Sequence, residues 1–284
     1  MEEKLNINGN SFELVKAQRE GISAVYKGEQ TYLRIGDKTK IVRDIENHRK
    51  MEGAGFPVAH IIEEGEYEGM RYFIETSLGE QTLGSLFAQD IKTQGYITDE
   101  HFSTFVSIAT TLAKAQMYTK TVSADFDAFA RAIHLDILQE ELPQHKDTLR
   151  DIFTEVSNRL SVFPFVLTHG DFNPHNIYPD GVIDFEDSFE GPFGYDVVGA
   201  LVHIDYFPDS QEYEYFAKYR FNQNQRESYL KAIDAVSQDA GLPKFSEHIS
   251  DFEFCRAVWS LVRMQKWPKL QQFRYDLFTE RFLK

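Results

Sequence analysis

A chain of 284 residues with 45 acidic and 30 basic side chains has a formal net charge of −15, which opposes binding to nucleic acid or to an anionic membrane. A hydrophobic content of 42% excludes a disordered chain, and the length suits one large domain or two lobes. The single Cys255 excludes an intrachain disulfide, and the scattered histidines give no zinc-type spacing.

The first residues, MEEKLNINGN, are acidic and polar rather than basic and then apolar, so no secretory signal is visible. No apolar run in the sequence approaches the ~20 residues that a membrane span needs. We therefore expect a soluble, cytoplasmic protein.

The N-terminal part of the chain shows the alternation of apolar and polar side chains that is typical of strands. Residues 11–36, divided by turns at Gly21 and Gly28, predict a three-stranded antiparallel meander. A helix is expected over residues 40–54, where apolar residues recur at helical spacing before a Gly-Pro stop signal. Strands follow at about 58–65 and 71–77.

The middle and the end of the chain show helical patterns. From about residue 82 to 162, apolar residues recur every three or four positions, which predicts amphipathic helices that share a core. A helix should open in GPFGYDVVGALVHI, and others are expected over roughly 209–222, 225–240 and 247–264. Asp196 lies near the start of the first of these, where a carboxylate would face backbone amides.

Residues 164–187, PFVLTHGDFNPHNIYPDGVIDFED, carry the strongest chemical signal. The apolar run 165–167 is typical of a buried strand, and a Pro-Asp-Gly turn would return the chain through Val182 and Ile183 as its hairpin partner. Such a hairpin would bring two loop carboxylates close to one another.

Three polar residues of this stretch suit phosphoryl transfer. A carboxylate at Asp171 could orient and deprotonate an attacking hydroxyl, while Asn176 and Asp184 offer the oxygen ligands that Mg²⁺ prefers. Taken singly, each is also an ordinary turn or strand-end residue. The ordered set favours the functional interpretation.

The stretch resembles the aminoglycoside phosphotransferase family, which is related to choline kinases and more distantly to protein kinases. The pattern HGDxxxxN, followed by an Asp that closes a strand, is met, and the likeness is carried by His169, Gly170, Asp171, Asn173, Pro174, Asn176, Ile183, Asp184, Phe185 and Asp196. The resemblance implies an α+β, two-lobed protein-kinase-like fold. A small antiparallel-sheet N-lobe (residues 1–78) would bind the nucleotide, and a mostly helical C-lobe (residues 79–284) would hold the catalytic loop and the substrate site.

The resemblance also assigns supporting and nucleotide-binding roles. His169, counted with Asp171 in the catalytic set, would hold the loop in shape, and Asp196 would support it. ATP, with GTP as an alternative, and Mg²⁺ are the implied cofactors. Ser23 would bind a nucleotide phosphate, although the loop before it has a single glycine, fits neither GxGxxG nor GxxxxGK, and is also compatible with a plain hairpin turn.

A cation on the third strand of the meander should face the α- and β-phosphates. Arg34 stands at this position, and a planar guanidinium can bind phosphate oxygens bidentately. Asp44 is assigned as the acid that braces this cation, with Glu46 as the alternative. The two cannot both face the strand, because residues two apart on a helix are separated by about 200° of rotation. The backbone of Thr76 and Leu78 would bind the nucleotide base at the hinge between the lobes.

The acceptor is less well specified. Carboxylates and aromatic side chains alternate in residues 205–216, DYFPDSQEYEYF, and together can hold an ammonium group, although solvated acids beside core aromatics are the common alternative. We expect a small-molecule hydroxyl substrate, preferably an aminoglycoside-like or other amino-bearing alcohol. A neutral metabolic alcohol of the choline, homoserine or sugar type, and a catalytically silent nucleotide-binding module, are the alternatives. The oligomeric state stays open.

Overall fold

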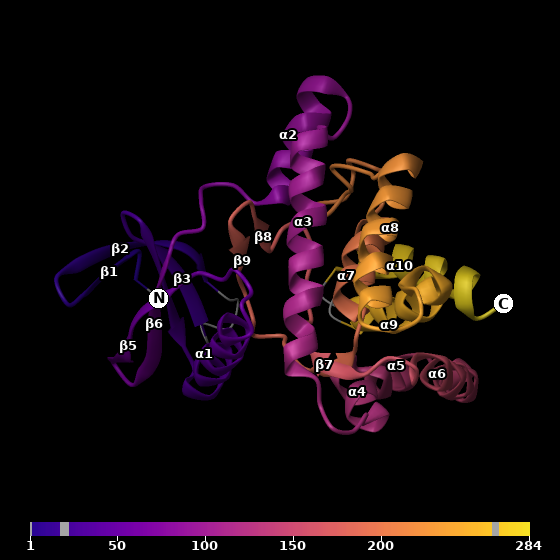
Figure 1. Cartoon of the computed structure of the whole chain (residues 1–284). Helices are drawn as coiled ribbons and strands as arrows, with labels where there is room; N and C mark the ends of the chain where they lie inside the picture. The colour runs from indigo at the N-terminus through magenta and orange to yellow at the C-terminus, as the bar shows by residue number, and fades with distance from the viewer. Residues whose placement is uncertain (1, 18–22, 263–266) are drawn as a thin grey trace.

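The computed structural model describes residues 2–17, 23–262 and 267–284, and they form two lobes (Figure 1). A curled antiparallel sheet with one helix makes up the N-terminal lobe, and helices make up most of the C-terminal lobe. The predicted α+β, protein-kinase-like architecture is confirmed. The division at residue 78 stays a prediction.

The N-terminal sheet has the strand order β1-β2-β3-β4-β6-β5. Its strands are β1 (Lys4–Ile7), β2 (Asn10–Ala17), β3 (Ser23–Lys27), β4 (Thr31–Gly36), β5 (Ile61–Tyr67) and β6 (Met70–Thr76). The predicted meander corresponds to β2, β3 and β4, whereas β1 was not predicted. Side chains of alternate residues, such as Phe12, Leu33 and Ile74, form an apolar core on one face of the sheet.

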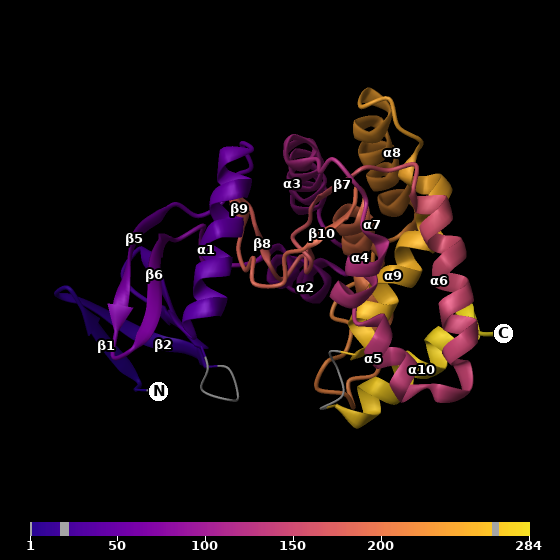
Figure 2. The same ribbon diagram turned by 90° about the horizontal axis from the view of Figure 1, so that it is seen from below.

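Helix α1 (Lys38–Gly53) lies between the sheet and the helical lobe (Figure 2). Asp37 caps its N-terminus by accepting hydrogen bonds from the amides of Thr39 and Lys40. Its buried side packs on β4 and β6, and Figure 2 shows it on the side of the sheet that faces the helical lobe. Asp44 also accepts a hydrogen bond from the amide of Phe185 at 3.2 Å, which ties α1 to the central stretch.

The C-terminal lobe packs around one large apolar core. Its α-helices are α2 (Leu83–Gln94), α3 (Asp99–Gln116), α4 (Phe126–Ala132), α5 (Leu135–Glu141), α6 (Lys146–Leu160), α7 (Tyr195–Val202), α8 (Gln223–Asp239), α9 (Ile249–Val262) and α10 (Pro268–Phe282). Short 3-10 helices lie at Met117–Thr119, Pro143–His145, His203–Tyr206 and Phe245–His248. None of the described helices is both long and apolar enough to cross a membrane.

The central stretch forms two short antiparallel pairs rather than the predicted single hairpin. Strand β7 (Phe165–Leu167) pairs with β10 (Glu190–Pro192), and the Pro-Asp-Gly turn joins β8 (Ile177–Tyr178) to β9 (Gly181–Val182). The predicted pairing of residues 165–167 with 182–183 is therefore wrong. The segment after β9 folds back on the loop before β8, because the Ile183 amide donates to the Asn176 carbonyl at 3.1 Å and the Ile183 carbonyl contacts Nε2 of His169 at 2.9 Å.

One further expectation about the C-terminal lobe was wrong, and one helix was not predicted. Residues 209–222 form turns instead of a helix, because Arg220 donates hydrogen bonds to the carbonyls of Ile204 and Phe207 and folds the segment back on itself. The last helix, α10, was not predicted. The helices expected at 225–240 and 247–264 correspond to α8 and α9.

Candidate active site

Two adjoining cavities lie between the lobes. One, of about 350 Å³, is lined by Arg34, Thr76, Leu78, Asn176 and Asp184 among others, and we call it the hinge cavity. The second, of about 570 Å³, has Asp171, Asn176 and Arg274 in its wall, and we call it the acceptor cavity. Because Asn176 lines both, the two cavities meet at the residues that the motif singled out.

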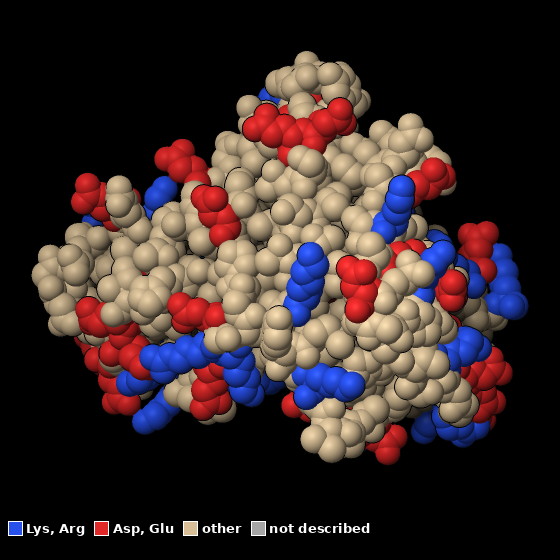
Figure 3. Space-filling view, in the orientation of Figure 1, with Lys and Arg blue, Asp and Glu red and all other residues tan. Residues whose placement is uncertain are grey.

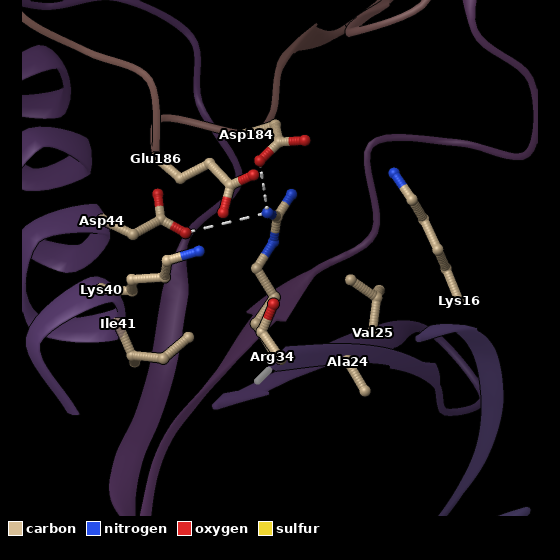
Figure 4. Close-up of a pocket in the computed structure, with 10 residues that line it drawn as sticks. Lys16, Ala24, Val25, Arg34, Lys40, Ile41, Asp44, Asp184 and Glu186 are labelled. Carbon is tan, nitrogen blue, oxygen red and sulfur yellow. Dashed lines mark hydrogen bonds and ion pairs between the residues drawn. The ribbon is translucent and has the colours of Figure 1, made fainter. Parts of the chain in front are cut away.

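Arg34 is the centre of an ion-pair cluster at the sheet side of the cleft. Arg34 is 8% exposed, and its guanidinium pairs with Glu75 at 3.0 Å and Asp184 at 3.0 Å, with Asp44 further away at 3.7 Å. Figure 4 shows the contacts of Asp44 and Asp184 meeting at the same nitrogen of the Arg34 head group. The alternative of a surface arginine is excluded by this burial.

Sequence reasoning missed Glu75, an acid that lies closer to Arg34 than Asp44 does. Glu75 reaches Nε of Arg34 from the neighbouring strand β6, and it is 3% exposed. Antiparallel pairing of β4 with β6 makes the contact, because Tyr32, two residues before Arg34, lies opposite Glu75. A charged residue directly after the apolar run of residues 72–74 was the available signal.

Asp44 is buried beneath the cluster, whereas Glu46 is exposed on the other side of α1. Burial, only partly offset by the Arg34 guanidinium, raises the pKa of Asp44 to about 7. Of the two acids that the sequence offered, Asp44 is therefore the one that faces Arg34, and at 3.7 Å it is a more distant partner than Glu75 and Asp184.

Asp184 adopts a left-handed backbone conformation with φ of +76°. Such a conformation is uncommon for residues with a side chain, and Asp and Asn tolerate it best. Burial works against the charged form, but the ion pair with Arg34 outweighs it and lowers the pKa of Asp184. The carboxylate stays ionised and retains an exposed fraction of 28% at the cavity.

Asp171 is held by a buried arginine that the sequence did not reveal. Arg256 of α9, 1% exposed, donates to Oδ1 of Asp171 at 2.7 Å and to the carbonyl of Gly170 at 2.8 Å. Asn173 donates to the same Oδ1 at 3.0 Å. The carboxylate is fixed in orientation and lies in the wall of the acceptor cavity.

Asn176 links the two cavities through its amide group. Its Nδ2 donates to the backbone carbonyl of Asp171 at 2.9 Å and to Oδ2 of the same residue at 3.2 Å. The amide oxygen is therefore the atom left to bind a cation, as the prediction of a metal ligand requires. The described residues contain no group of three or more His, Cys, Asp or Glu that could hold a metal by themselves.

An oxygen pair from Asn176 and Asp184 nevertheless fits Mg²⁺ with a nucleotide. This ion keeps several waters and is usually bound through one or two protein oxygens together with substrate phosphates. Lys16, Lys40 and Glu186 line the small cavity beside Arg34 together with Asp44 and Asp184, and the ionised carboxylate of Asp184 supplies the negative charge that a divalent cation would neutralise.

The 168–176 loop is held from beneath by Asp196 and His169. Asp196 accepts hydrogen bonds from the amides of His169 at 2.6 Å and Gly170 at 3.1 Å. His169 accepts from the Asp171 amide through Nδ1 and contacts the Ile183 carbonyl through Nε2 at 2.9 Å. Both residues are buried, and these contacts suit a role in shaping the loop.

Asp196 lies in the first turn of α7 but does not cap this helix, because the N-cap is Gly194 and has no side-chain hydrogen bond. Gln116 of α3, which was not among the predicted residues, donates to Asp196 at 2.5 Å and to the Leu167 carbonyl at 3.1 Å. It belongs to the support of the loop.

The remaining predicted nucleotide contacts are placed at the sheet. Ser23 lines a small cavity beside Arg34 and Asp184. The loop before it, residues 18–22, in which the phosphate loop was predicted, lies outside the described residues. The Thr76 amide donates to the His60 carbonyl at 2.9 Å, which leaves Leu78 as the better placed of the two hinge residues.

Two of the four acids in the predicted ammonium site of residues 205–216 pair with arginines. Asp205 pairs with Arg226 at 2.6 Å and Asp209 with Arg220 at 2.8 Å. Glu214 is the acid of this segment that lines the acceptor cavity, with Tyr215 and Phe216 beside it in the sequence.

Comparison with known proteins gives a family match and similar folds. A model described as the phosphotransferase enzyme family matches residues 27–231. An aminoglycoside-3'-phosphotransferase of type VIII is 13% identical with a TM-score of 0.55, covering 89% of this chain and 94% of its own. A choline/ethanolamine kinase family protein from Mesorhizobium loti is 14% identical with a TM-score of 0.58, covering 95% of this chain and 86% of its own.

A third solved structure contains ligands. The aminoglycoside phosphotransferase APH(3'')-Id from Streptomyces rimosus, in complex with ADP and streptomycin, is 13% identical with a TM-score of 0.50, and the match covers 85% of this chain and 92% of that one. A comparison with curated protein sequences found no significant match.

Proposed function

Because the chain belongs to the phosphotransferase enzyme family, we propose that it is a small-molecule kinase that transfers the γ-phosphoryl group of ATP to a hydroxyl group. GTP is the alternative donor, and Mg²⁺ the implied metal. The ADP complex of the similar Streptomyces rimosus enzyme supports a nucleotide as the donor.

One observation carries the proposal. Asp171 lies in the wall of the acceptor cavity and Asp184 in the wall of the hinge cavity, while Asn176 lies in both. A general base, a metal-binding carboxylate and an amide oxygen thus meet at the junction of two cavities, which suits an in-line transfer from one to the other.

The proposed reaction uses Asp171 as the base. The acceptor oxygen forms a bond to the γ-phosphorus, the bond to the bridging oxygen breaks, and the leaving nucleoside diphosphate takes the electron pair. The hydroxyl proton passes to Asp171, whose carboxylate is oriented by Arg256 and Asn173.

The sheet lobe holds the donor in this scheme. Arg34 lies beside Asp184 and would bind phosphate oxygens, with Glu75 and Asp44 fixing its orientation. Asn176 and Asp184 would hold Mg²⁺, which supplies positive charge to the phosphate oxygens when it is bound. Ser23 adds a phosphate contact, and Leu78 a backbone contact to the base.

The acceptor is a small polar alcohol in this proposal. An amino group on it is supported by Glu214 in the cavity wall. The catalytically silent alternative is disfavoured, because Asp171, Asn176 and Asp184 lie together at the cleft.

Exchange of Asp171 tests the proposal. In Asp171→Asn, we expect turnover of ATP with an active hydroxyl compound to fall about 100-fold to 10,000-fold, because the general base is lost. The thermal shift caused by Mg·ATP should persist. Asp239→Asn, at the exposed end of α8, is the matched control and should turn over normally. Near-normal turnover of Asp171→Asn would overturn the assignment.

A further inference from the structure

The acceptor cavity is rich in positive charge, although the protein as a whole carries a net charge of −15. Lys16, Lys218 and Arg274 line it, against the acids Asp171 and Glu214. On the face shown in Figure 3, acidic and basic side chains are interspersed.

Arg274 of α10 is the least expected of these cations. It is 1% exposed, and its guanidinium donates to the carbonyls of Tyr206 and Ser260, each at 2.9 Å. The third nitrogen, Nη2, has no hydrogen-bond partner, and no carboxylate within the described ranges pairs with this arginine. The guanidinium also lies over the ring of Phe207 at 4.7 Å.

A buried guanidinium with neutral partners is costly. Removing an ion from water carries a penalty of several kcal/mol that two carbonyls compensate in part. Burial first, and then the charge of Arg256, lower the pKa of Arg274 to about 9. Arg256 and Arg274 thus share the field of one carboxylate, Asp171, and Arg256 already bonds to it.

We propose that the acceptor of the phosphotransferase carries an anionic group, a carboxylate or a phosphate monoester, that binds to Arg274 in the acceptor cavity. The inference rests on the proposed function, because it names the class of molecule whose hydroxyl faces Asp171. In this proposal the buried Nη2 of Arg274, which has no hydrogen-bond partner, would donate to the anion, and Lys218, which is exposed and also lines the cavity, would add positive charge.

An anion site at Arg274 disfavours an alcohol whose only charged group is an amine. Glu214 is exposed at the cavity, whereas Arg274 is buried in its wall, so the stronger and less screened field is the positive one. An acceptor with a lone amine would meet three cations there. An amine is compatible with the site when the same molecule also carries the anion.

Matched acceptors test the proposal directly. Wild-type protein is given Mg·ATP and compounds that share one hydroxyl-bearing skeleton: glycerate with glyceramide, and glycerol 3-phosphate with glycerol and 3-amino-1,2-propanediol. We expect kcat/KM for an anionic member to exceed that of its neutral and cationic counterparts by about tenfold to a hundredfold. The carboxylate and phosphate arms distinguish the two anions. Preference for the amine or equal rates across a set would overturn the proposal.

Substitutions of Arg274 and Lys218 test whether the anionic group binds beside these cations. In Arg274→Met, KM for the preferred anionic acceptor should rise about tenfold or more, while KM for ATP changes less than twofold. Arg274→Lys should recover part of the loss. Because Arg274 is buried and its replacement can unfold the protein, Lys218→Met gives a second test, with a smaller rise in the same constant. Lys231→Met, on the exposed side of α8, is the matched control.

Other results distinguish a failure of the anion site from a failure of the proposed kinase function. If Arg274→Met lowers kcat equally for every acceptor and raises KM for ATP, Arg274 acts on the phosphoryl group and the proposal is wrong. If Mg·ATP binds but no member of the panel is phosphorylated, the anionic acceptor class is wrong and the nucleotide site stands. If Mg·ATP does not bind, the proposed function itself fails.

Discussion

The buried ion-pair clusters on the two sides of the cleft have opposite proportions of carboxylates and guanidiniums. On the sheet side, one guanidinium, Arg34, is surrounded by the carboxylates of Glu75, Asp44 and Asp184. On the helical side, the guanidiniums of Arg256 and Arg274 lie near one carboxylate, Asp171. Neither imbalance serves stability, because a buried charge without compensation is unfavourable. The comparison suggests that each side is completed by a ligand, a metal cation on the first and an anion on the second.

Asp184→Asn tests the proposed metal site on the sheet side of the cleft. Asn accepts the left-handed backbone at this position, so the substitution removes charge with little strain. At 100 times the dissociation constant, Mg·ATP should stabilise the wild type by about 2.7 kcal/mol, seen as a rise in Tm. In the variant we expect that rise to vanish. Asp180→Asn, in the exposed β8–β9 turn, is the control, and an unchanged shift in Asp184→Asn would refute the metal assignment.

Arg256→Met tests the helical side. Asp171 loses the partner that orients it, and we expect kcat to fall about tenfold to a hundredfold with KM for ATP within twofold. The informative measurement is a double-mutant cycle with Asp171→Asn. If Arg256 acts through Asp171, its removal in the Asp171→Asn background costs no further turnover, and additive losses would argue for an independent role.

The raised pKa of Asp44 gives a smaller, pH-dependent effect. Its folded value of about 7 lies above its ordinary value of 3.8, so between these pH values the native state binds more protons than the unfolded state. The contribution of Asp44 to stability is therefore present at low pH and is lost as pH rises toward 7. Between pH 5 and pH 8, the free energy of unfolding of Asp44→Asn relative to wild type should rise, on the order of 2 kcal/mol.

Urea unfolding of the ligand-free protein measures this difference. Glu46→Gln is the matched control, because it removes an exposed carboxylate from the same helix and leaves the ion pairs of Arg34 in place. A pH-independent difference between Asp44→Asn and wild type would show that Asp44 stays ionised beside Arg34.

The sequence predicted best what is determined locally. Asp171, Asn176 and Asp184 lie close together in the chain, and a short loop followed by the β8–β9 hairpin suffices to bring them to one place. The family and the two-lobed fold are confirmed, while the roles assigned to these three residues remain proposals. The incorrect pairing predicted for β7 shows the limit of this reasoning. A Pro-Asp-Gly turn predicts that the segments on its two sides form a hairpin, but it does not predict which strand pairs with β7.

Residues that reach the site from afar were not predicted. Glu75 needs the pairing of β4 with β6, and Arg256 needs α9 to pack beneath the 168–176 loop. Arg274 left a signal that could have been used, because it stands four residues from both Leu270 and Phe278 on the buried side of α10. A charged residue in phase with an apolar helix face indicates a buried polar contact.

A crystal structure with Mg²⁺ and a non-hydrolysable ATP analogue tests the central claim most directly. The account predicts a metal about 2.1 Å from the amide oxygen of Asn176 and a carboxylate oxygen of Asp184, with the terminal phosphate facing Asp171. A nucleotide bound elsewhere, or a metal that contacts neither Asn176 nor Asp184, would contradict it.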